Sequence, residues 1–276
     1  GVPCHHRPRH EQWIWDGTPL QGRRVLVRCY HGLGDTLQFV RFVPWVRALA
    51  AEVTVWAQPA LLPLLRTLPG VGRLLPLHDG TPGVEYDVDV EVMELAHVFR
   101  TTLDTLPAEV PYLHVDPSPL PTDGLAAGRL RVGLVWRAGD WDERRSLPFP
   151  LLAPLAELPG VELHVLQRGP ALAEHPEGFG VVSGSDSVLE AARVIRALDV
   201  VVTVDSMPAH LAGALGVPTW TLLHADADWR WMEGRADSPW YPTMRLFRQE
   251  RPGEWEPVIA RVAAGLRRRA EEKGSG

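Results

Sequence analysis

Short apolar runs alternate with amphipathic segments along most of the chain. In the first part, strands are expected over 23–29 and 53–57, and two shorter ones within GRLLPL and YDVDVEV. A helix after the first strand is predicted from apolar residues at every third position, which are Leu37, Val40, Val43 and Val46. Pro44 should kink this helix, because an interior proline removes a backbone hydrogen bond. Strands that alternate with helices predict parallel pairing in an α/β layer.

The alternation starts again near residue 130. Strands are expected within LRVGLVW, VELHVL, DVVVTV and PTWTLL, helices within PLLAPLAEL, SVLEAARVIRAL and PAHLAGAL, and a final helix over 256–269. Residues 116–129 are rich in proline and glycine, which is typical of an interdomain linker. The sequence therefore predicts two α/β domains, over 1–120 and 121–252, followed by a C-terminal helix and tail over 253–276. A cleft between two such domains is a favoured place for a ligand.

Composition narrows the classes of function. With 276 residues and a formal net charge of −6, the chain is long enough for two domains and lacks the basic footprint of a nucleic-acid-binding protein. No apolar run approaches the ~18–20 residues of a membrane span, so no integral membrane segment is expected. Cys4 and Cys29 are too few for a disulfide framework, which fits a reducing cytoplasm. Because Lys273 is the only lysine, an anion site must be built from arginine, histidine and backbone N–H groups.

The sharpest local pattern is TVDSMPAHLAGALG, in the second region. A buried strand is expected to end at Asp205, Ser206 is a favoured helix cap, and Pro208 fits the first helical turn. Gly216 is suited to ending that helix. His210 then falls near the positive end of the helix dipole, where a phosphate group binds readily. The pattern fits a capped crossover helix with a packed histidine equally well, and both interpretations stay open.

Arginines gather after the first strand of the second region. The segment VWRAGDWDERRS carries Arg137, Arg144 and Arg145 together with three acidic residues. Gln167 and Arg168 follow the next strand in the same way. The carboxyl ends of strands in open α/β sheets meet at a ligand crevice, so these groups favour an anionic ligand there. The alternative is a solvated loop whose charges pair with one another.

The stretch HGLGDTLQF joins the first strand to the first helix. Two glycines could hold a pyrophosphate, but the third glycine of a dinucleotide fingerprint is missing, and no acidic residue ends the next strand. Asp35 either caps the helix or serves as a catalytic carboxylate. A metal site is not expected in CHHRPRH, because its cysteine and histidines have no partner cluster at zinc spacing; these are Cys4, His5, His6 and His10.

Taken in order, these motifs resemble the ADP-heptose:lipopolysaccharide heptosyltransferase-like glycosyltransferases, in the bacterial branch often fused to tetratricopeptide repeats. The resemblance lies between Trp15 and Gln249, in WDGTPLQGRRVLV, GLGDTLQFVRFVP, TTLDTLPAEVPYL, RVGLVW, RRSLP, VDSMPAHLAGALGVP and DWRWMEGRADSPWYPTMRLFRQ. It implies a GT-B fold, with two Rossmann-like domains that face each other across a cleft and a C-terminal helix that returns to the first domain. It also implies inverting, metal-independent sugar transfer from a nucleoside-diphosphate donor.

The roles of individual residues follow from the same resemblance. Asp35 matches the aspartate that acts as the base at the acceptor. The donor diphosphate would be bound by Arg137, Asp205, Ser206, Met207 and His210, with further donor contacts from Trp136, Arg145, Gln167 and Arg168. The acceptor side would include His31, Gly34, Gln38 and Glu94. No cofactor and no metal are expected.

Three departures from the family pattern bear on activity. The chain offers only arginine where heptosyltransferases place a lysine near the phosphates, Met207 replaces a small residue at the helix start, and Glu94 stands where serine is common. Two hypotheses of different class are therefore kept. The first is a glycosyltransferase with an unidentified acceptor hydroxyl, and the second is a nucleotide-sugar-binding or interaction protein of the same fold without turnover. A nucleotide-sugar epimerase or hydrolase is the third possibility.

Overall fold

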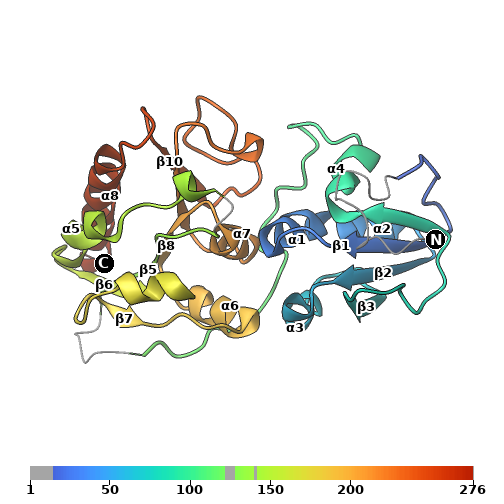
Figure 1. Ribbon diagram of the computed structural model, residues 1–276, viewed down its shortest axis with the longest axis horizontal. Helices are drawn as coiled ribbons and strands as arrows, with labels where there is room; N and C mark the ends of the chain where they lie inside the picture. The colour runs from blue at the N-terminus through green and yellow to red at the C-terminus, as the bar shows by residue number, and fades with distance from the viewer. Residues whose placement is uncertain (1–14, 122–127, 140–141, 276) are drawn as a thin grey trace. The chain divides into compact units, whose positions relative to one another are not determined.

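The computed structural model describes residues 15–121, 128–139 and 142–275. The Cys4, His5, His6 and His10 cluster lies outside the described residues. The chain divides into two compact units, Gly1–His114 and Val115–Gly276, each with its own sheet (Figure 1). The first unit therefore ends at His114, whereas the boundary predicted from the sequence follows residue 120.

The first unit is built on a four-stranded parallel sheet in the order β3-β2-β1-β4. Its strands are β1 (Arg24–Cys29), β2 (Glu52–Ala57), β3 (Arg73–Pro76) and β4 (Val88–Glu91). The helical segments are α1 (Leu33–Phe39), η3 (Val40–Phe42), α2 (Val43–Leu49), η4 (Pro59–Leu61), α3 (Leu62–Leu65), η5 (Val92–Glu94) and α4 (Leu95–Val98). All four predicted strands are confirmed.

The helix predicted to kink at Pro44 is divided into three segments. A 3-10 turn, Val40–Phe42, separates α1 from α2, and Pro44 lies in the first turn of α2. A proline costs little there, because the N–H that it lacks has no partner within the helix. The apolar stripe is buried as expected, since Leu37, Val40 and Val43 have no exposed surface.

The second unit contains a six-stranded parallel sheet in the order β10-β9-β8-β5-β6-β7. Its strands are β5 (Leu130–Val135), β6 (Val161–Val165), β7 (Val181–Val182), β8 (Val200–Val204), β9 (Thr219–Leu223) and β10 (Met244–Arg248). The helical segments are η6 (Glu143–Arg145), η7 (Phe149–Leu152), α5 (Ala153–Ala156), η8 (Pro170–Glu174), α6 (Val188–Arg196), α7 (Met207–Ala214), η9 (Trp229–Trp231) and α8 (Glu256–Gly274). Strands β7 and β10 were not predicted.

The C-terminal helix α8 is part of the second unit. It packs on β5, β6 and β10 and clusters with the second unit (Figure 1). Gly265 brings it against the Trp220 ring, where a Cβ atom would come within 2.8 Å. At its other end, Lys273 contacts the carboxylate of Asp199 at 2.5 Å, and Arg269 donates to the Asp199 carbonyl at 3.3 Å. These contacts explain why the helix runs to Gly274 rather than to residue 269.

Candidate functional site

Each sheet has one point at which the strand order changes direction. In the second unit, β5 lies between β6 and β8, so the chain winds outward on both sides of β5. In the first unit, β1 lies between β2 and β4 in the same way. The loops that leave the two central strands turn to opposite faces of the sheet at such a switch point, and open α/β sheets bind ligands there. The candidate ligand sites are therefore the loops after β5 and β8 in the second unit and those after β1 and β4 in the first.

At the switch point of the second unit, Arg145 joins the two loops. Its Nη1 donates to the carbonyl of Asp205 at 3.1 Å, and its Nη2 donates to the carbonyl of Gly139 at 3.4 Å. The N–H of Ala138 donates to Ser146 Oγ at 3.0 Å, which closes the loop that carries Arg145. The structure therefore places this guanidinium at the start of α7, as a donor-binding role would require.

The first turn of α7 has the predicted outline, but Ser206 does not cap it through its side chain. Ser206 is the N-cap residue in extended conformation, yet its Oγ donates back to the Val204 carbonyl at 3.1 Å. Pro208 lies in the first turn, and Gly216 has φ of +70° beyond the end of the helix. Because the Ser206 hydroxyl is directed toward β8, it leaves the first-turn N–H groups of α7 for another acceptor.

The Asp205 carboxyl is 6% exposed at the end of β8. Burial raises its pKa, while contact with Trp231 and the positive charges of Arg145 and Arg230 act in the opposite direction. Met207, the next candidate along the chain, is half-buried in the first turn of α7. An anion that binds here meets the guanidinium of Arg145 and the N-terminus of α7.

His210 lies at the expected place in the helix but is enclosed by aromatic side chains. It is 3% exposed, its Nδ1 is 3.0 Å from the Tyr241 hydroxyl, and its ring stacks on Trp231 at 5.4 Å. Trp231 and Tyr241 are fully buried, and Gly213 approaches the Tyr241 ring so closely that a Cβ would lie 2.5 Å from it. The structure thus places His210 in a packed polar-aromatic cluster, which fits the interpretation of a packed histidine. Sequence reasoning assigned no role to Tyr241.

The remaining donor candidates make contacts within the protein. Trp136 is fully buried, and its Nε1 donates to Glu174 at 3.2 Å. Gln167 is 6% exposed, and its Oε1 accepts the N–H groups of Trp136 and Arg137 at 3.1 and 2.9 Å, so it ties the end of β6 to the end of β5. Arg137 pairs with Glu174 at 2.8 Å. These three side chains organise the sheet edge.

Arg168 forms an ion pair with the carboxylate of Asp186 at 2.6 Å. The pair is largely exposed, with 36% of the arginine side chain and 78% of the aspartate side chain accessible. An exposed pair of this kind contributes little to stability. It agrees with the alternative in which loop charges pair with one another.

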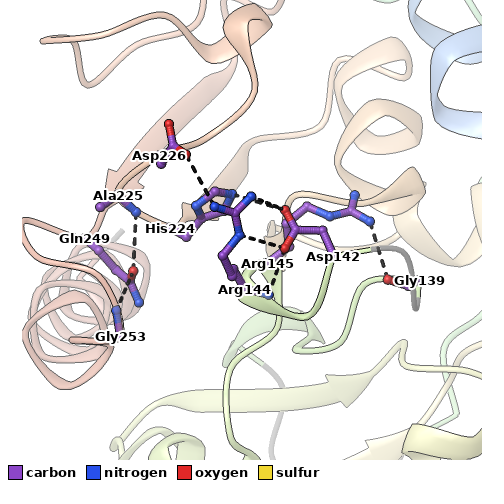
Figure 2. A network of polar contacts seen from close by, with 9 residues as sticks. All are labelled: Gly139, Asp142, Arg144, Arg145, His224, Ala225, Asp226, Gln249 and Gly253. Atoms are coloured by element: carbon purple, nitrogen blue, oxygen red, sulfur yellow. Dashed lines mark hydrogen bonds and ion pairs between the residues drawn. The ribbon is translucent and has the colours of Figure 1, made fainter.

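A further polar network lies where β9 ends, and sequence reasoning missed it (Figure 2). His224 follows β9, is 5% exposed, and has its Nε2 at 3.9 Å from Asp142. Arg144 contacts Asp142 at 2.9 Å and Asp226 at 3.3 Å. Burial lowers the pKa of His224, and the nearby charge of Arg144 adds to that effect, which favours the neutral imidazole. A single histidine after a predicted strand was the only signal in the sequence.

At the switch point of the first unit, Asp35 is half-buried and caps α1. Its Oδ2 accepts the N–H of Gly32 at 3.0 Å, in a capping box at the start of that helix. His31 and Gly34 lie in the same loop and are half-buried. Asp35 thus supports the start of α1, but as the third helical residue that accepts from the N-cap residue Gly32 and not through the first-turn N–H groups.

Two glutamates end β4 beside this loop. Glu94 accepts the N–H groups of Glu91 and Trp15 at 3.3 and 3.2 Å, so it caps a turn. Glu91 is 5% exposed, its Oε2 accepts the N–H of Met93 at 2.8 Å, and its Oε1 lies 3.5 Å from His31 Nε2. Burial raises the pKa of Glu91 to about 8, and the charges of Glu94 and Asp35 add to the shift. The carboxyl of Glu91 is thus largely protonated at neutral pH.

Gln38 does not reach the surface as an acceptor-side residue would. It is fully buried, and neither polar atom of its side-chain amide has a hydrogen-bond partner. Its carbonyl accepts from Arg41 Nε at 2.7 Å, and Arg41 in turn donates to the Tyr112 hydroxyl at 3.0 Å.

Among the described residues, no group of three or more histidine, cysteine, aspartate or glutamate side chains is arranged to hold a metal ion. Within the same residues, no helix combines the length and the apolar character that a bilayer span requires.

The region that contains α7 and the aromatic cluster agrees with one protein family. Residues 167–253 match the model of glycosyltransferase family 9 (heptosyltransferase). The second unit carries a family 9 match. The predicted resemblance to heptosyltransferase-like glycosyltransferases is thereby confirmed. A curated relative, protein FlbA of Caulobacter vibrioides, is 29% identical over 293 residues, which cover 92% of this chain and 48% of that protein. The chain thus spans about half the length of this relative.

Solved structures agree with the fold across both units. A family 9 glycosyl transferase from Veillonella parvula superposes with a TM-score of 0.64 at 13% identity, covering 91% of this chain and 99% of that one. The ADP-heptose lipopolysaccharide heptosyltransferase II of Escherichia coli gives 0.57 at 14% identity, covering 89% and 99%. The iron-containing dodecameric glycosyltransferase TibC of the same species gives 0.59 at 13% identity, covering 94% and 77%. These matches confirm the GT-B fold class.

Proposed function

We propose that this chain is a glycosyltransferase that moves a sugar from a nucleoside-diphosphate donor to an acceptor hydroxyl, with inversion and without a metal ion. The observation that carries the proposal is the contact between Arg145 and the start of α7. It joins a cation to a helix N-terminus at the switch point, and α7 lies inside the segment that matches family 9.

The donor diphosphate is assigned to the first turn of α7. The N–H groups of Ser206 and Met207 and the helix dipole supply fixed positive charge, and Arg145 supplies a charged fork for phosphate oxygens. Burial raises the pKa of Asp205, while the positive charges of Arg145 and Arg230 act in the opposite direction. His210, held by Tyr241 and Trp231, supports this turn from inside rather than from the surface.

The acceptor side is assigned to Asp35. In a single displacement, the acceptor oxygen forms a bond to the anomeric carbon as the bond from that carbon to the diphosphate breaks. The acceptor proton passes to the Asp35 carboxylate, and the departing diphosphate keeps the electron pair. General-base assistance of this kind contributes ~10²–10⁴-fold in rate. Arg145 and the N-terminus of α7 stabilise the charge that develops on the leaving group.

A second candidate function is a nucleotide-sugar-binding protein without turnover. It is favoured by the ion pairs of Arg137 with Glu174 and of Arg168 with Asp186, because these occupy cations that were predicted to face the donor. Such a protein would keep the α7 site and tolerate the loss of Asp35.

The deciding experiment compares binding and transfer in the same variants. The diphosphates UDP, ADP, GDP and dTDP are titrated by calorimetry in EDTA, and transfer of labelled sugar from the matching donor is followed in a bacterial lysate. The Asp35→Asn variant should bind the diphosphate as the wild type does and lose transfer by at least ~10²-fold. Asp104→Asn, at an exposed position of the same unit, is the matched control and should change neither. Binding by the wild type without any transfer would favour the second candidate.

A further inference from the structure

Trp229 is unlike the other tryptophans of its region. It has 60% of its surface exposed, whereas Trp231 is fully buried and Trp240 is 4% exposed. An isolated exposed apolar side chain is common on protein surfaces. What requires an explanation is that this one is held in place on a short helix whose Trp231 packs on His210 of α7.

The indole of Trp229 is fixed on two sides. Its ring meets Trp240 edge-on, with centroids 6.1 Å apart and planes at 74°, and the Arg230 guanidinium lies 5.8 Å from the ring centroid. Asp228 caps the short helix η9 by accepting the N–H of Arg230 at 3.0 Å. A rigid aromatic side chain loses little conformational entropy when a ligand packs on it.

The backbone that presents Trp229 is strained and clamped. Met232 ends η9 with φ of +50°, a left-handed conformation that is costly for a residue other than glycine. Arg248, on β10, donates to the carbonyls of both Trp231 and Met232. This turn directs Trp231 onto His210 while it leaves Trp229 at the surface. Strain that the surrounding structure maintains is typical of functional segments.

The same turn borders the first residues of α7. Trp231, two residues after Trp229 in η9, stacks on His210 of α7 with ring centroids 5.4 Å apart, so η9 packs against α7. The sugar of a nucleotide-sugar is bonded directly to the second phosphate. A residue that holds the sugar must therefore lie near the phosphate site, and Trp229 belongs to the short helix η9, whose Trp231 packs on α7.

We propose that Trp229 is a stacking platform for the sugar ring of the nucleotide-sugar donor. The inference rests on the proposed function. The C–H face of a pyranose is apolar and packs on an indole, while its hydroxyls hydrogen-bond to carboxylates at the rim. Asp226, Asp228 and Asp237 supply such carboxylates on both sides of Trp229 in the sequence, and the side chains of Asp226 and Asp237 are 86% and 70% exposed. Carboxylates would repel a phosphate, so the platform is assigned to the sugar and not to the diphosphate.

The test measures two ligands on the same protein. Calorimetry compares the free diphosphates ADP, UDP, GDP and dTDP with ADP-heptose, UDP-glucose, GDP-mannose and dTDP-rhamnose. Trp229→Ala should weaken the nucleotide sugar that the wild type prefers by about 5–10-fold and leave its diphosphate unchanged. Trp229→Phe should restore most of the affinity, because a smaller ring still offers a flat face. Leu103→Ala, at a side chain of the first unit that is 59% exposed, is the matched control and should alter neither affinity.

The other outcomes each overturn the proposal in a recognisable way. An equal loss for diphosphate and nucleotide sugar in Trp229→Ala would assign the indole to the nucleobase. An unchanged affinity for both would show that Trp229 does not contact the donor. Absence of binding of any nucleotide or nucleotide sugar by the wild type would refute the proposed function, and the platform with it. Binding of diphosphates without any contribution from the sugar would refute the platform alone.

Discussion

The close approach of Gly213 to Tyr241 makes the sharpest prediction. In the Gly213→Ala variant, the new Cβ would lie 2.5, 2.7 and 2.8 Å from Cδ1, Cγ and Cε1 of the Tyr241 ring. Distances below 3.0 Å are not tolerated, so either the ring or α7 must move. Tyr241 is fully buried and its hydroxyl is 3.0 Å from His210 Nδ1, so the ring has no open space to enter.

Two opposing effects determine the size of the change. Alanine in place of glycine inside a helix stabilises it by ~1 kcal/mol at most. Overpacking of a closed core costs ~1–3 kcal/mol. The net result should be a loss of about 1–2 kcal/mol in the free energy of unfolding of the second unit. Because the displaced Tyr241 is the partner of His210, the affinity for the preferred diphosphate should fall as well.

Urea unfolding, followed by tryptophan fluorescence, measures the first effect, and calorimetry with the diphosphate measures the second. Gly274→Ala is the matched control, since it adds the same methyl group to a helical glycine with nothing within 4 Å. That variant should unfold at the wild-type urea concentration or slightly above it. A Gly213→Ala protein with wild-type stability and wild-type diphosphate affinity would refute the reasoning, because it would show that the ring can move without consequence.

Three further predictions follow from the same structure. Gly265→Ala should destabilise the packing of α8 by ~1–3 kcal/mol in urea unfolding, because its Cβ would lie 2.8 Å from the Trp220 ring; an unchanged midpoint would contradict this. Arg145→Lys keeps the charge but not the fork, so diphosphate affinity should fall about tenfold, whereas Arg168→Ala should leave it unchanged; equal affinities would remove Arg145 from the site. Burial raises the pKa of Glu91 from 4.5 to about 8, so the folded chain holds that proton more firmly than the unfolded chain. The stability that this group contributes below pH ~4.5 is therefore lost as the pH rises through about 8. In urea unfolding, the free energy of unfolding of Glu91→Gln relative to that of the wild type should rise by a few kcal/mol between pH 5 and 9. A difference in the free energy of unfolding that stays constant with pH would refute the pKa shift.

Much of the fold was determined by the sequence on its own. Buried β-branched runs such as VVVTV predict parallel strands because both faces of such a sheet are covered. Gly216 ended α7 as predicted, because glycine adopts the left-handed backbone that follows a helix at little cost. Asp35 at the start of α1 was interpreted as a possible cap on the same kind of local evidence. These features depend on residues within a few positions of one another, so the local pattern suffices.

The identity of the site residues depended on the tertiary structure. Arg145 reaches Asp205 across 60 positions of sequence, because the strand order places β5 beside β8. Tyr241 meets His210 across 31 positions, and this contact encloses a histidine for which the helix pattern alone left both a phosphate site and a packed position open. Arg137 was expected to face the donor, yet Glu174 lies within 2.8 Å of it. Charge and periodicity specify which groups can bind an anion, but strand order and packing decide which of them a carboxylate or an aromatic ring already occupies.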